Sequence, residues 1–365
     1  MSRIHELRKV ALLAIVLTGA VAGQEPANPP PAAAPPAATP TAAAPSPVHR
    51  ELWSVKSPLG LEDVGLTAPD DNPITKPKVA LGKKLFWDKR LSPQNTHACE
   101  TCHDPEKGWT DGTQFSVKAD GAINTRHSPT LYNVAYNKFF YWDGRAPSLE
   151  KQILAAWEGQ MGAKGKTSEL AKKINDVPGY KKLFGEAFQG DANPDRVVAA
   201  IASFTRTIMS GNSHYDAYAS GKQDAISDAA KRGFNLFRTK ARCATCHPPG
   251  LFTDQGFHNI GVGGGTPKED PGYGKVANHP SYNGAFKTPT LRNVLSHPPF
   301  GHTGQFRNLM DFLKYAELPF DSPNMDPIFK GGIKLTEPEK SDLREFIRSL
   351  DSADDAETSS KPELP

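Results

Sequence analysis

The sequence predicts a mainly α-helical protein built from two related halves, with long loops and little β-structure. One observation is a pentapeptide, Cys-x-x-Cys-His, that stands at Cys99–His103 and again at Cys243–His247. A second is that other short segments recur in the same order after each copy. A third is that the apolar residues between these segments fall at helical spacing, whereas 31 glycines and 33 prolines in 365 residues indicate many loops.

The repeated pentapeptide is the attachment sequence of a c-type haem, in which two thiols bond the porphyrin and the His binds the iron. The two copies use all four cysteines, and the expected haem-binding residues are Cys99, Cys102, His103, Cys243, Cys246 and His247. A four-thiolate zinc site is usually built from closer Cys pairs and needs no His directly after both. A redox dithiol is expected beside a βαβ unit, which neither copy has. Two covalently bound haem c groups are therefore predicted.

The predicted helices lie in two cytochrome c-like haem domains, at residues 51–212 and 213–351. A polar, disordered tail is expected at residues 352–365. The apolar spacing and the turn residues predict helices near residues 78–88, 148–157, 168–175 and 195–209 of the first domain, and near 227–238, 307–316 and 337–350 of the second. Residues 104–125 and 261–274 are expected to be long loops.

The beginning of the chain has the pattern of a secretory signal peptide at residues 1–23. Basic residues precede an apolar run at 10–21, and small residues suit cleavage near Ala22. The run is short for a membrane span, so an uncleaved anchor is the less favoured alternative. Residues 24–50 are rich in Pro and Ala and should form an extended linker. Export and covalent haem attachment together predict the periplasm.

The charge balance limits the kinds of partner. The formal charge is +3, from 43 Lys and Arg against 40 Asp and Glu, with no long run of one sign. This balance favours neither nucleic acid nor an anionic membrane surface as a partner. Both a monomer and a homodimer are compatible with the sequence.

An internal repeat relates the two halves. Pro-Thr-Leu-x-Asn-Val begins at Pro129 and at Pro289, and in each half 13 residues separate that Pro from Trp142 or His302. Equal offsets without a gap indicate that the halves arose by duplication of one haem-binding unit. Because equivalent positions now carry different side chains, the two haems are expected to have different roles.

The order of the motifs resembles that of the bacterial dihaem cytochrome c peroxidase and MauG superfamily, over about residues 61–350. The matching segments are Arg-x-Ser-Pro-Thr-Leu, Phe-x-Trp-Asp-Gly-Arg-Ala, Phe-Thr-Asp, Pro-Thr-Leu-Arg-Asn and His-x-Gly-x-Phe, placed around the two haem motifs. The resemblance implies that peroxide reacts at the N-terminal haem and that the C-terminal haem supplies electrons. It also implies that Trp142 is an electron relay between them.

Two departures from the family pattern concern the peroxide site. Family members usually carry a His in the loop after the first haem motif, but residues 104–125 contain none, so the N-terminal iron should keep an open sixth position at rest. The family's Glu-Met is replaced by Gln160-Met161. A Gln side chain can hold peroxide by hydrogen bonds but cannot transfer a proton at neutral pH. Glu158 is the expected substitute for the missing acid or base.

The resemblance also suggests the remaining ligands. His103 and His247 are the expected proximal iron ligands, and the family's sixth ligand to the C-terminal haem falls near Tyr315. Met310 and Met325 are alternatives to Tyr315, as is the absence of a protein ligand. Arg292 is expected to pair with a haem propionate or with a carboxylate.

A calcium ion commonly lies between the two domains of family members. The matching positions here are the side chain of His127 and the carbonyl groups of His297 and Pro299. Because His is a poor ligand for so hard a cation, calcium is expected only if water replaces the lost oxygen.

The leading interpretation is a periplasmic peroxidase that reduces hydrogen peroxide at the haem of His103. A small redox protein would supply electrons through the haem of His247 and Trp142. The alternative enzyme is of the maturation type, in which both haems reach the Fe(IV) level and a partner protein is oxidised; the missing loop His and Tyr315 favour it. The alternative of another class is a non-enzymatic carrier with two six-coordinate haems.

Overall fold

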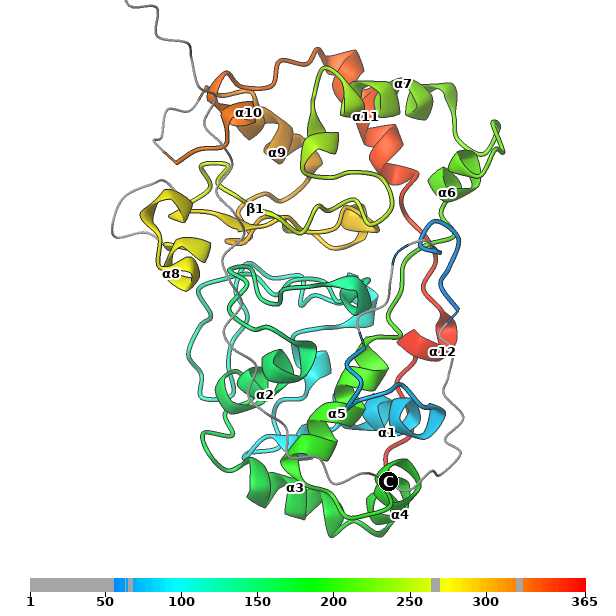
Figure 1. The fold of residues 1–365 in the computed structure, drawn as a ribbon, viewed down its shortest axis with the longest axis vertical. Helices are drawn as coiled ribbons and strands as arrows, with labels where there is room; N and C mark the ends of the chain where they lie inside the picture. The colour runs from blue at the N-terminus through cyan, green and yellow to red at the C-terminus, as the bar shows by residue number, and fades with distance from the viewer. Residues whose placement is uncertain (1–55, 63, 65–67, 264–269, 320–323) are drawn as a thin grey trace, which may run out of the picture. The chain divides into compact units, whose positions relative to one another are not determined.

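Figure 1 shows the computed structural model, which describes residues 56–62, 64, 68–263, 270–319 and 324–365. The described residues belong to one compact unit and are mainly helical, with little strand. The predicted signal peptide and nearly all of the predicted linker lie outside these residues, so both stay predictions. None of the described helices is long and apolar enough to cross a membrane.

The N-terminal half is organised around two crossing helices. Helix α1, Lys76–Trp87, begins at Thr75, whose hydroxyl accepts a hydrogen bond from a main-chain N–H of the first turn. Its buried face packs on α5, Pro194–Thr205. Gly82 permits this contact, because a Cβ at that position would lie 1.9 Å from the carbonyl oxygen of Ala200.

Three further helices complete this half: α2 Leu149–Gly159, α3 Thr167–Asn175 and α4 Pro178–Phe188. The helices predicted near residues 78–88, 148–157, 168–175 and 195–209 are confirmed, although the last ends four residues earlier than expected. Helix α4 was not predicted. Proline at its first position marks its beginning, and Tyr180, Phe184 and Ala187 form its buried face.

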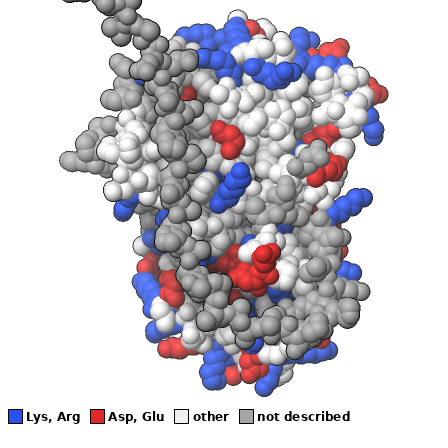
Figure 2. Space-filling model, in the orientation of Figure 1, with Lys and Arg blue, Asp and Glu red and all other residues white. Residues whose placement is uncertain are grey.

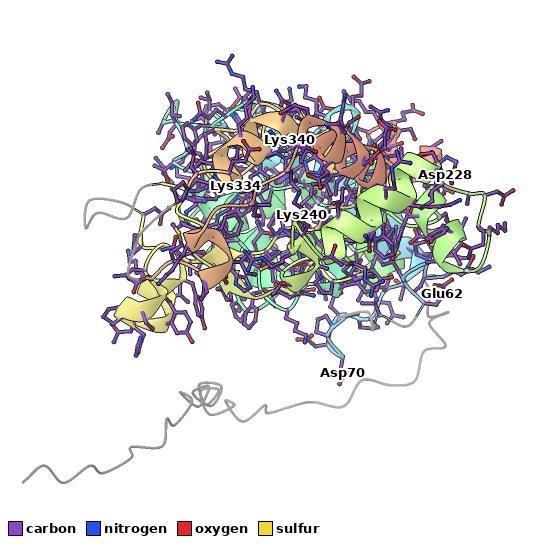
Figure 3. The ribbon with its side chains drawn as sticks, turned by 90° about the horizontal axis from the view of Figure 1, so that it is seen from above. Glu62, Asp70, Asp228, Lys240, Lys334 and Lys340 are labelled. Atoms are coloured by element: carbon purple, nitrogen blue, oxygen red, sulfur yellow. The ribbon has the colours of Figure 1, made fainter. Side chains whose placement is uncertain are left out.

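The C-terminal half repeats the crossing. Helix α7, Asp228–Arg238, packs on α11, Glu337–Arg348. A Cβ at Gly233 of α7 would lie 2.0 Å from the carbonyl oxygen of Asp342. Just beyond α7, the ammonium of Lys240, labelled in Figure 3, lies 2.7 Å from a carboxylate oxygen of Glu339 in α11.

The other helices of this half are α6 His214–Ala219, α8 Tyr273–Ala277, α9 Leu309–Ala316 and α10 Pro327–Lys330. The predicted helices near 227–238, 307–316 and 337–350 are confirmed to within two residues at each end. The described strands are two residues long: β1, Phe257–His258, pairs antiparallel with β2, Phe286–Lys287, so that Phe257 is opposite Lys287.

Buried apolar side chains form one cluster in each half. One cluster takes its buried members from residues 81–208 and another from residues 215–350. A third, smaller cluster joins the halves through Leu61, Ala135, Tyr136 and Leu251. The predicted domain boundary at residues 212 and 213 falls between the two large clusters and stays a prediction.

The structure differs from the expected disorder of residues 352–365. This segment forms helix α12, Ala356–Ser359, and packs against the N-terminal half. Tyr132 donates a hydrogen bond of 2.7 Å to Asp354, and Arg90 donates one of 2.9 Å to the carbonyl oxygen of Pro365. The segment is polar, as sequence reasoning noted, but its partners come from distant parts of the chain, which composition alone does not reveal.

Charged side chains of both signs are interspersed on the face that Figure 2 shows. This distribution agrees with the balanced composition of the chain.

Candidate haem and peroxide site

The first haem motif begins on a short 3₁₀ helix, η2, Cys99–Thr101. His103 Nδ1 donates a hydrogen bond of 3.0 Å to the carbonyl oxygen of Trp109, which leaves Nε2 available to bind iron. Burial lowers the pKa of His103, so the imidazole is held in the neutral form that binds metal.

The second motif has the same local structure on η5, Cys243–Thr245. His247 Nδ1 donates a hydrogen bond of 2.8 Å to the carbonyl oxygen of Phe252, and burial again lowers the pKa of the imidazole. Burial raises the pKa of the Cys99 and Cys243 thiols to about 12. A protonated thiol is a poor nucleophile, so these groups do not suit a catalytic dithiol.

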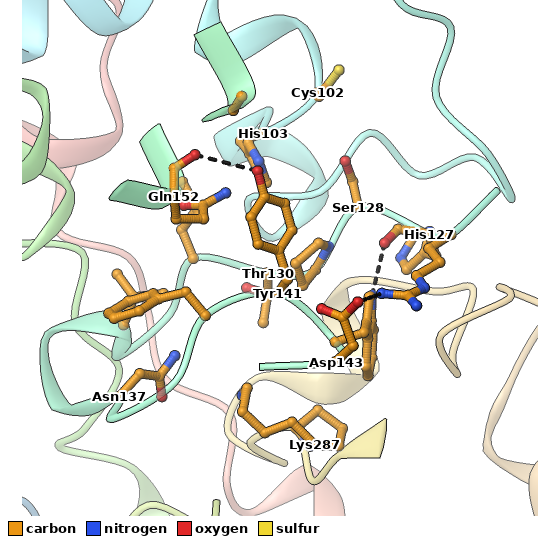
Figure 4. A pocket seen from close by; sticks show the side chains of 18 of the residues that line it. Cys102, His103, His127, Ser128, Thr130, Asn137, Tyr141, Asp143, Gln152 and Lys287 are labelled. Atoms are coloured by element: carbon orange, nitrogen blue, oxygen red, sulfur yellow. Dashed lines mark hydrogen bonds and ion pairs between the residues drawn. The ribbon is translucent and has the colours of Figure 1, made fainter. Parts of the chain in front are cut away.

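A cavity of about 1150 Å³ adjoins the first motif. Cys99, Cys102 and His103 line it, together with apolar side chains that include Phe86, Leu91, Ile153 and Trp157. Figure 4 shows His103 and Cys102 at one side of this cavity and Lys287, from the C-terminal half, at the opposite side. Two thiols, an imidazole with a free Nε2 and a large apolar space are the features that a covalent haem requires, so the residues fit this cofactor.

Trp142 lies where the two halves meet. Its indole Nε1 donates a hydrogen bond of 2.9 Å to the carbonyl oxygen of His127, drawn in Figure 4. Its own carbonyl oxygen accepts one of 2.7 Å from the main chain of Lys287. The Trp142 ring lies 6.4 Å from that of His302, which stacks on Phe286 at 3.5 Å. Trp142 also lines the cavity, so it contacts both halves beside the haem site.

The structure separates Gln160 from Glu158. Gln160 lines the cavity, and its buried Oε1 has no hydrogen-bond partner among the described residues. Glu158 is not among the cavity residues, and its carboxylate accepts a hydrogen bond of 2.5 Å from the main chain of Gly165. The structure thus does not place Glu158 in the cavity lining, and its expected role as the distal acid or base stays a prediction. Residues two positions apart on a helix point to different faces, so only one of the two can face the haem.

Arg292 binds a carboxylate instead of extending into the cavity. Its side chain is 0% exposed and forms two contacts of 2.8 Å with the carboxylate of Asp216. Its Nε donates a further hydrogen bond of 2.7 Å to the carbonyl oxygen of Gly250. Of the two partners expected for Arg292, the structure shows the carboxylate, and a role in binding haem is not supported.

The candidate sixth ligands belong to the C-terminal half. Tyr315, near the end of α9, donates a hydrogen bond of 3.0 Å to the carbonyl oxygen of Ile260, and burial raises the pKa of its phenol to about 12. Met325 is buried in the apolar cluster of this half, and Met310 packs against the same cluster. Which of the three binds the iron of the second haem stays a prediction.

The residues matched to calcium include two imidazoles. His127 Nδ1 donates a hydrogen bond of 2.8 Å to the carbonyl oxygen of Thr113, while its Nε2 and that of His297 are buried without a partner among the described residues. Burial lowers the pKa of His297 to about 4. The imidazole of His127 is a poor calcium ligand, and calcium bound by the side chain of His127 and the carbonyl groups of His297 and Pro299 stays a prediction.

The described residues contain one group of three side chains that could bind another metal ion: Cys246, Asp254 and His258. Its Cys belongs to the second haem motif, and His258 is hydrogen-bonded to both Asp254 and Asp326 at 2.8 Å. The close approach of these three side chains is therefore accounted for by the haem motif and by the two ion pairs of His258.

Sequence reasoning missed the charges that line the cavity. Arg126 Nη1 lies 2.7 Å from a carboxylate oxygen of Asp143, and Arg126 Nε donates a hydrogen bond of 2.6 Å to Asp270 of the other half. Lys287 lines the same cavity. Arg126 was visible in the Arg-x-Ser-Pro-Thr-Leu segment, but nothing in the sequence indicated its partners.

Comparison with known proteins agrees with this site. The family model described as di-haem cytochrome c peroxidase matches residues 76–224. The methylamine utilization protein MauG of Methylophilus methylotrophus is 37% identical over 293 residues, which cover 78% of this chain and 86% of that protein. The cytochrome-c peroxidase IdrP1 of Pseudomonas sp. (strain SCT) is 33% identical over 77% of this chain and 83% of its own length.

Among solved structures, that of a MauG-like protein associated with microbial copper homeostasis has a TM-score of 0.74 and 28% sequence identity. The match covers 86% of this chain and 98% of that one. The fold and the site thus define a haem c oxidoreductase that uses peroxide. The chain belongs to the di-haem cytochrome c peroxidase family, which includes proteins named MauG.

Proposed function

We propose that the chain reduces hydrogen peroxide at the haem held by Cys99, Cys102 and His103, with electrons that arrive from the second haem through Trp142. The observation that carries this proposal is the place of Trp142, which lines the cavity and is hydrogen-bonded to main-chain groups of both halves. The signal-like residues 1–23 support export to the periplasm, where a small redox protein would be the electron donor.

When bound, the haem supplies the redox chemistry, and the chain positions the reactants. The carbonyl oxygen of Trp109 fixes the ring orientation of His103. The amide of Gln160 is the polar group available to hold peroxide by hydrogen bonds. Both carboxylates that line the cavity, Asp143 and Asp270, are paired with Arg126, so protons are expected to come from water.

Gln160→Glu tests this account of proton transfer. It would place a carboxylate at the peroxide site, and we expect the rate constant for reaction with peroxide to rise about a hundredfold, the lower end of the range for a general acid or base. Stopped-flow spectroscopy at several pH values measures this constant. Glu158→Gln is the matched control, and an equal change in both variants would contradict the assignment of Gln160 to the site.

Trp142→Phe tests the relay. The variant keeps an aromatic ring but loses the hydrogen bond to His127 and the more readily oxidised indole. We expect electron transfer between the haems to slow about tenfold, which corresponds to ~1.4 kcal/mol in the barrier. Haem content should not change. Flash or stopped-flow reduction of one haem, followed at the absorbance of the other, measures the rate; equal rates in both proteins would remove Trp142 from the path.

A second candidate function is oxidation of a partner protein, the maturation-type reaction that the resemblance to the MauG superfamily implies. The absence of His from residues 104–125 and the position of Tyr315 favour it. Mixing the fully oxidised protein with peroxide separates the two candidates. Rapid formation of a stable, two-electron-oxidised state without prior reduction supports the maturation type, whereas a need for prior reduction of one haem supports the ordinary peroxidase. A simple electron carrier would show only low-spin haem and would not bind cyanide.

We further propose that the two halves arose by duplication. Gly82 and Gly233 both stand three residues before a Leu-Phe pair, and both allow two helices to touch. The isolated bridge Phe140–Ala146 has its counterpart in Phe300–Phe306, at equal distances from the two Pro-Thr-Leu segments. A crystal structure in which the two haem units superposed no better than unrelated helical segments would contradict the duplication.

A further inference from the structure

The cavity beside the first haem motif is lined by more positive than negative charge. Its cations are Lys118, Arg126, Arg145, Lys275 and Lys287, and its carboxylates are Asp143 and Asp270. Both carboxylates are already paired with arginine, at distances of 2.6 to 2.9 Å. The cavity therefore has unsatisfied positive charge and suits an anionic occupant.

Three lysines of this lining, Lys118, Lys275 and Lys287, have an ammonium group with no hydrogen bond or ion pair to a described residue. Of these, Lys287 is the one that also contacts Trp142 through its main chain. Burial lowers the pKa of Lys287 to about 8, and the charge of Asp254 only partly opposes this effect. Lys287 is half-buried, and its side chain lines the cavity. An ammonium held there without a partner is costly, and in native proteins such groups are usually paired with an anion. Figure 4 shows the Lys287 side chain on the wall of the cavity, opposite His103.

The main chain of Lys287 also contacts Trp142, the candidate electron relay. Its N–H donates a hydrogen bond of 2.7 Å to the carbonyl oxygen of Trp142. Lys287 belongs to β2, where it is paired with Phe257 of β1. Phe257 in turn packs on the turn after Trp142, since a Cβ at Gly144 would lie 2.4 Å from the Phe257 ring. One residue of the C-terminal half thus contacts Trp142 with its main chain and lines the haem cavity with its side chain.

We propose that Lys287 pairs with a propionate of the haem held in this cavity and so positions that haem relative to Trp142. This assignment rests on the proposed function and extends it, because it names the residue that holds the haem in position relative to Trp142. A haem carboxylate satisfies the ammonium without any further ligand, and the excess of cations over carboxylates in the lining favours the negative charge of the haem propionates. Lys287 acts here as a positioning residue and takes no part in bond breaking.

The test is a spectroscopic redox titration of the purified holoprotein, its Lys287→Met variant and its Lys287→Gln variant. A positive charge near a haem favours the reduced state, so its removal should lower the reduction potential of the haem in the N-terminal half. We expect the equilibrium constant for reduction of this haem to fall about tenfold in Lys287→Met, a shift of 59 mV for one electron. The Gln side chain is of similar length and can donate a hydrogen bond, but it has no charge. The equilibrium constant for reduction should therefore also be lower in Lys287→Gln. Haem content should stay at two per chain.

Lys275→Met is the matched control, because Lys275 lines the same cavity but is exposed. We expect it to leave the potential nearly unchanged. An unchanged potential in both Lys287 variants, an equal shift in the control, or a shift confined to the second haem would overturn the assignment. A shift that is seen only in buffer containing phosphate or chloride would also overturn the assignment, because the partner of Lys287 would then be an anion from solution. The potential is measured without peroxide, so a failed peroxidase assay would count against the proposed function and leave this result standing.

Discussion

Replacement of Arg292 by Met is expected to destabilise the protein by about 3–5 kcal/mol, the cost of leaving one partner of a buried ion pair alone. Arg292 is fully buried, and both of its terminal nitrogens contact the carboxylate of Asp216. Asp216 would keep hydrogen bonds from Ser213 but lose its counter-charge. Chemical denaturation of the variant and the wild type, followed by far-ultraviolet circular dichroism, measures the difference.

The double variant Arg292→Met, Asp216→Asn separates the loss of charge from the loss of packing. Removal of both charges should restore part of the stability, because no uncompensated charge then remains buried. Arg232→Met is the surface control: Arg232 pairs with Asp342 at 2.7 Å, but its side chain is largely exposed, and no measurable change is expected. An Arg292→Met variant as stable as the control would show that the pair does not hold segments 216 and 292 together.

The sequence was sufficient to predict those features that depend on residues close together in the chain. The haem-binding residues follow from five consecutive positions, and Cys99 to His103 do line a cavity of suitable size. Trp142 was singled out by the resemblance of its segment, Phe-x-Trp-Asp-Gly-Arg-Ala, to the family, and the structure places it beside that cavity. The crossing helices followed from apolar spacing and capping residues. All of these features are encoded locally.

The features that were missed depend on contacts between distant residues. Arg292 and Asp216 are 76 positions apart, and Tyr132 and Asp354 are 222 apart. The tail was expected to be disordered because its composition is polar, although its hydrogen-bond partners lie in the N-terminal half. Glu158 and Gln160 could not be distinguished without the direction of each side chain on α2. Lys287 carried no recognisable motif, because its role depends on a cavity that exists only in the folded chain.

The close contact of helices α1 and α5 at Gly82 leads to a prediction of a large loss of stability. Gly82→Ala would bring a Cβ to 1.9 Å from the carbonyl oxygen of Ala200, which is backbone and cannot rotate away. Helices α1 and α5 would have to separate, and we expect a loss of at least about 3 kcal/mol, the upper end of the usual cost of overpacking. Because α1 packs against η2, which begins with Cys99, separation should also reduce the amount of haem bound at the first motif.

Gly185→Ala in α4 is the matched control for this substitution. A Cβ there has no neighbour within 4 Å, and Ala is favoured over Gly inside a helix by roughly 0.5–1 kcal/mol, so this variant should be at least as stable as the wild type. Thermal unfolding of both variants and the haem content of each, measured by the pyridine haemochrome spectrum, provide the comparison. If Gly82→Ala also gained stability, the close approach of α1 and α5 would not exist in solution, and the support that these helices give to the first haem motif would have to be abandoned.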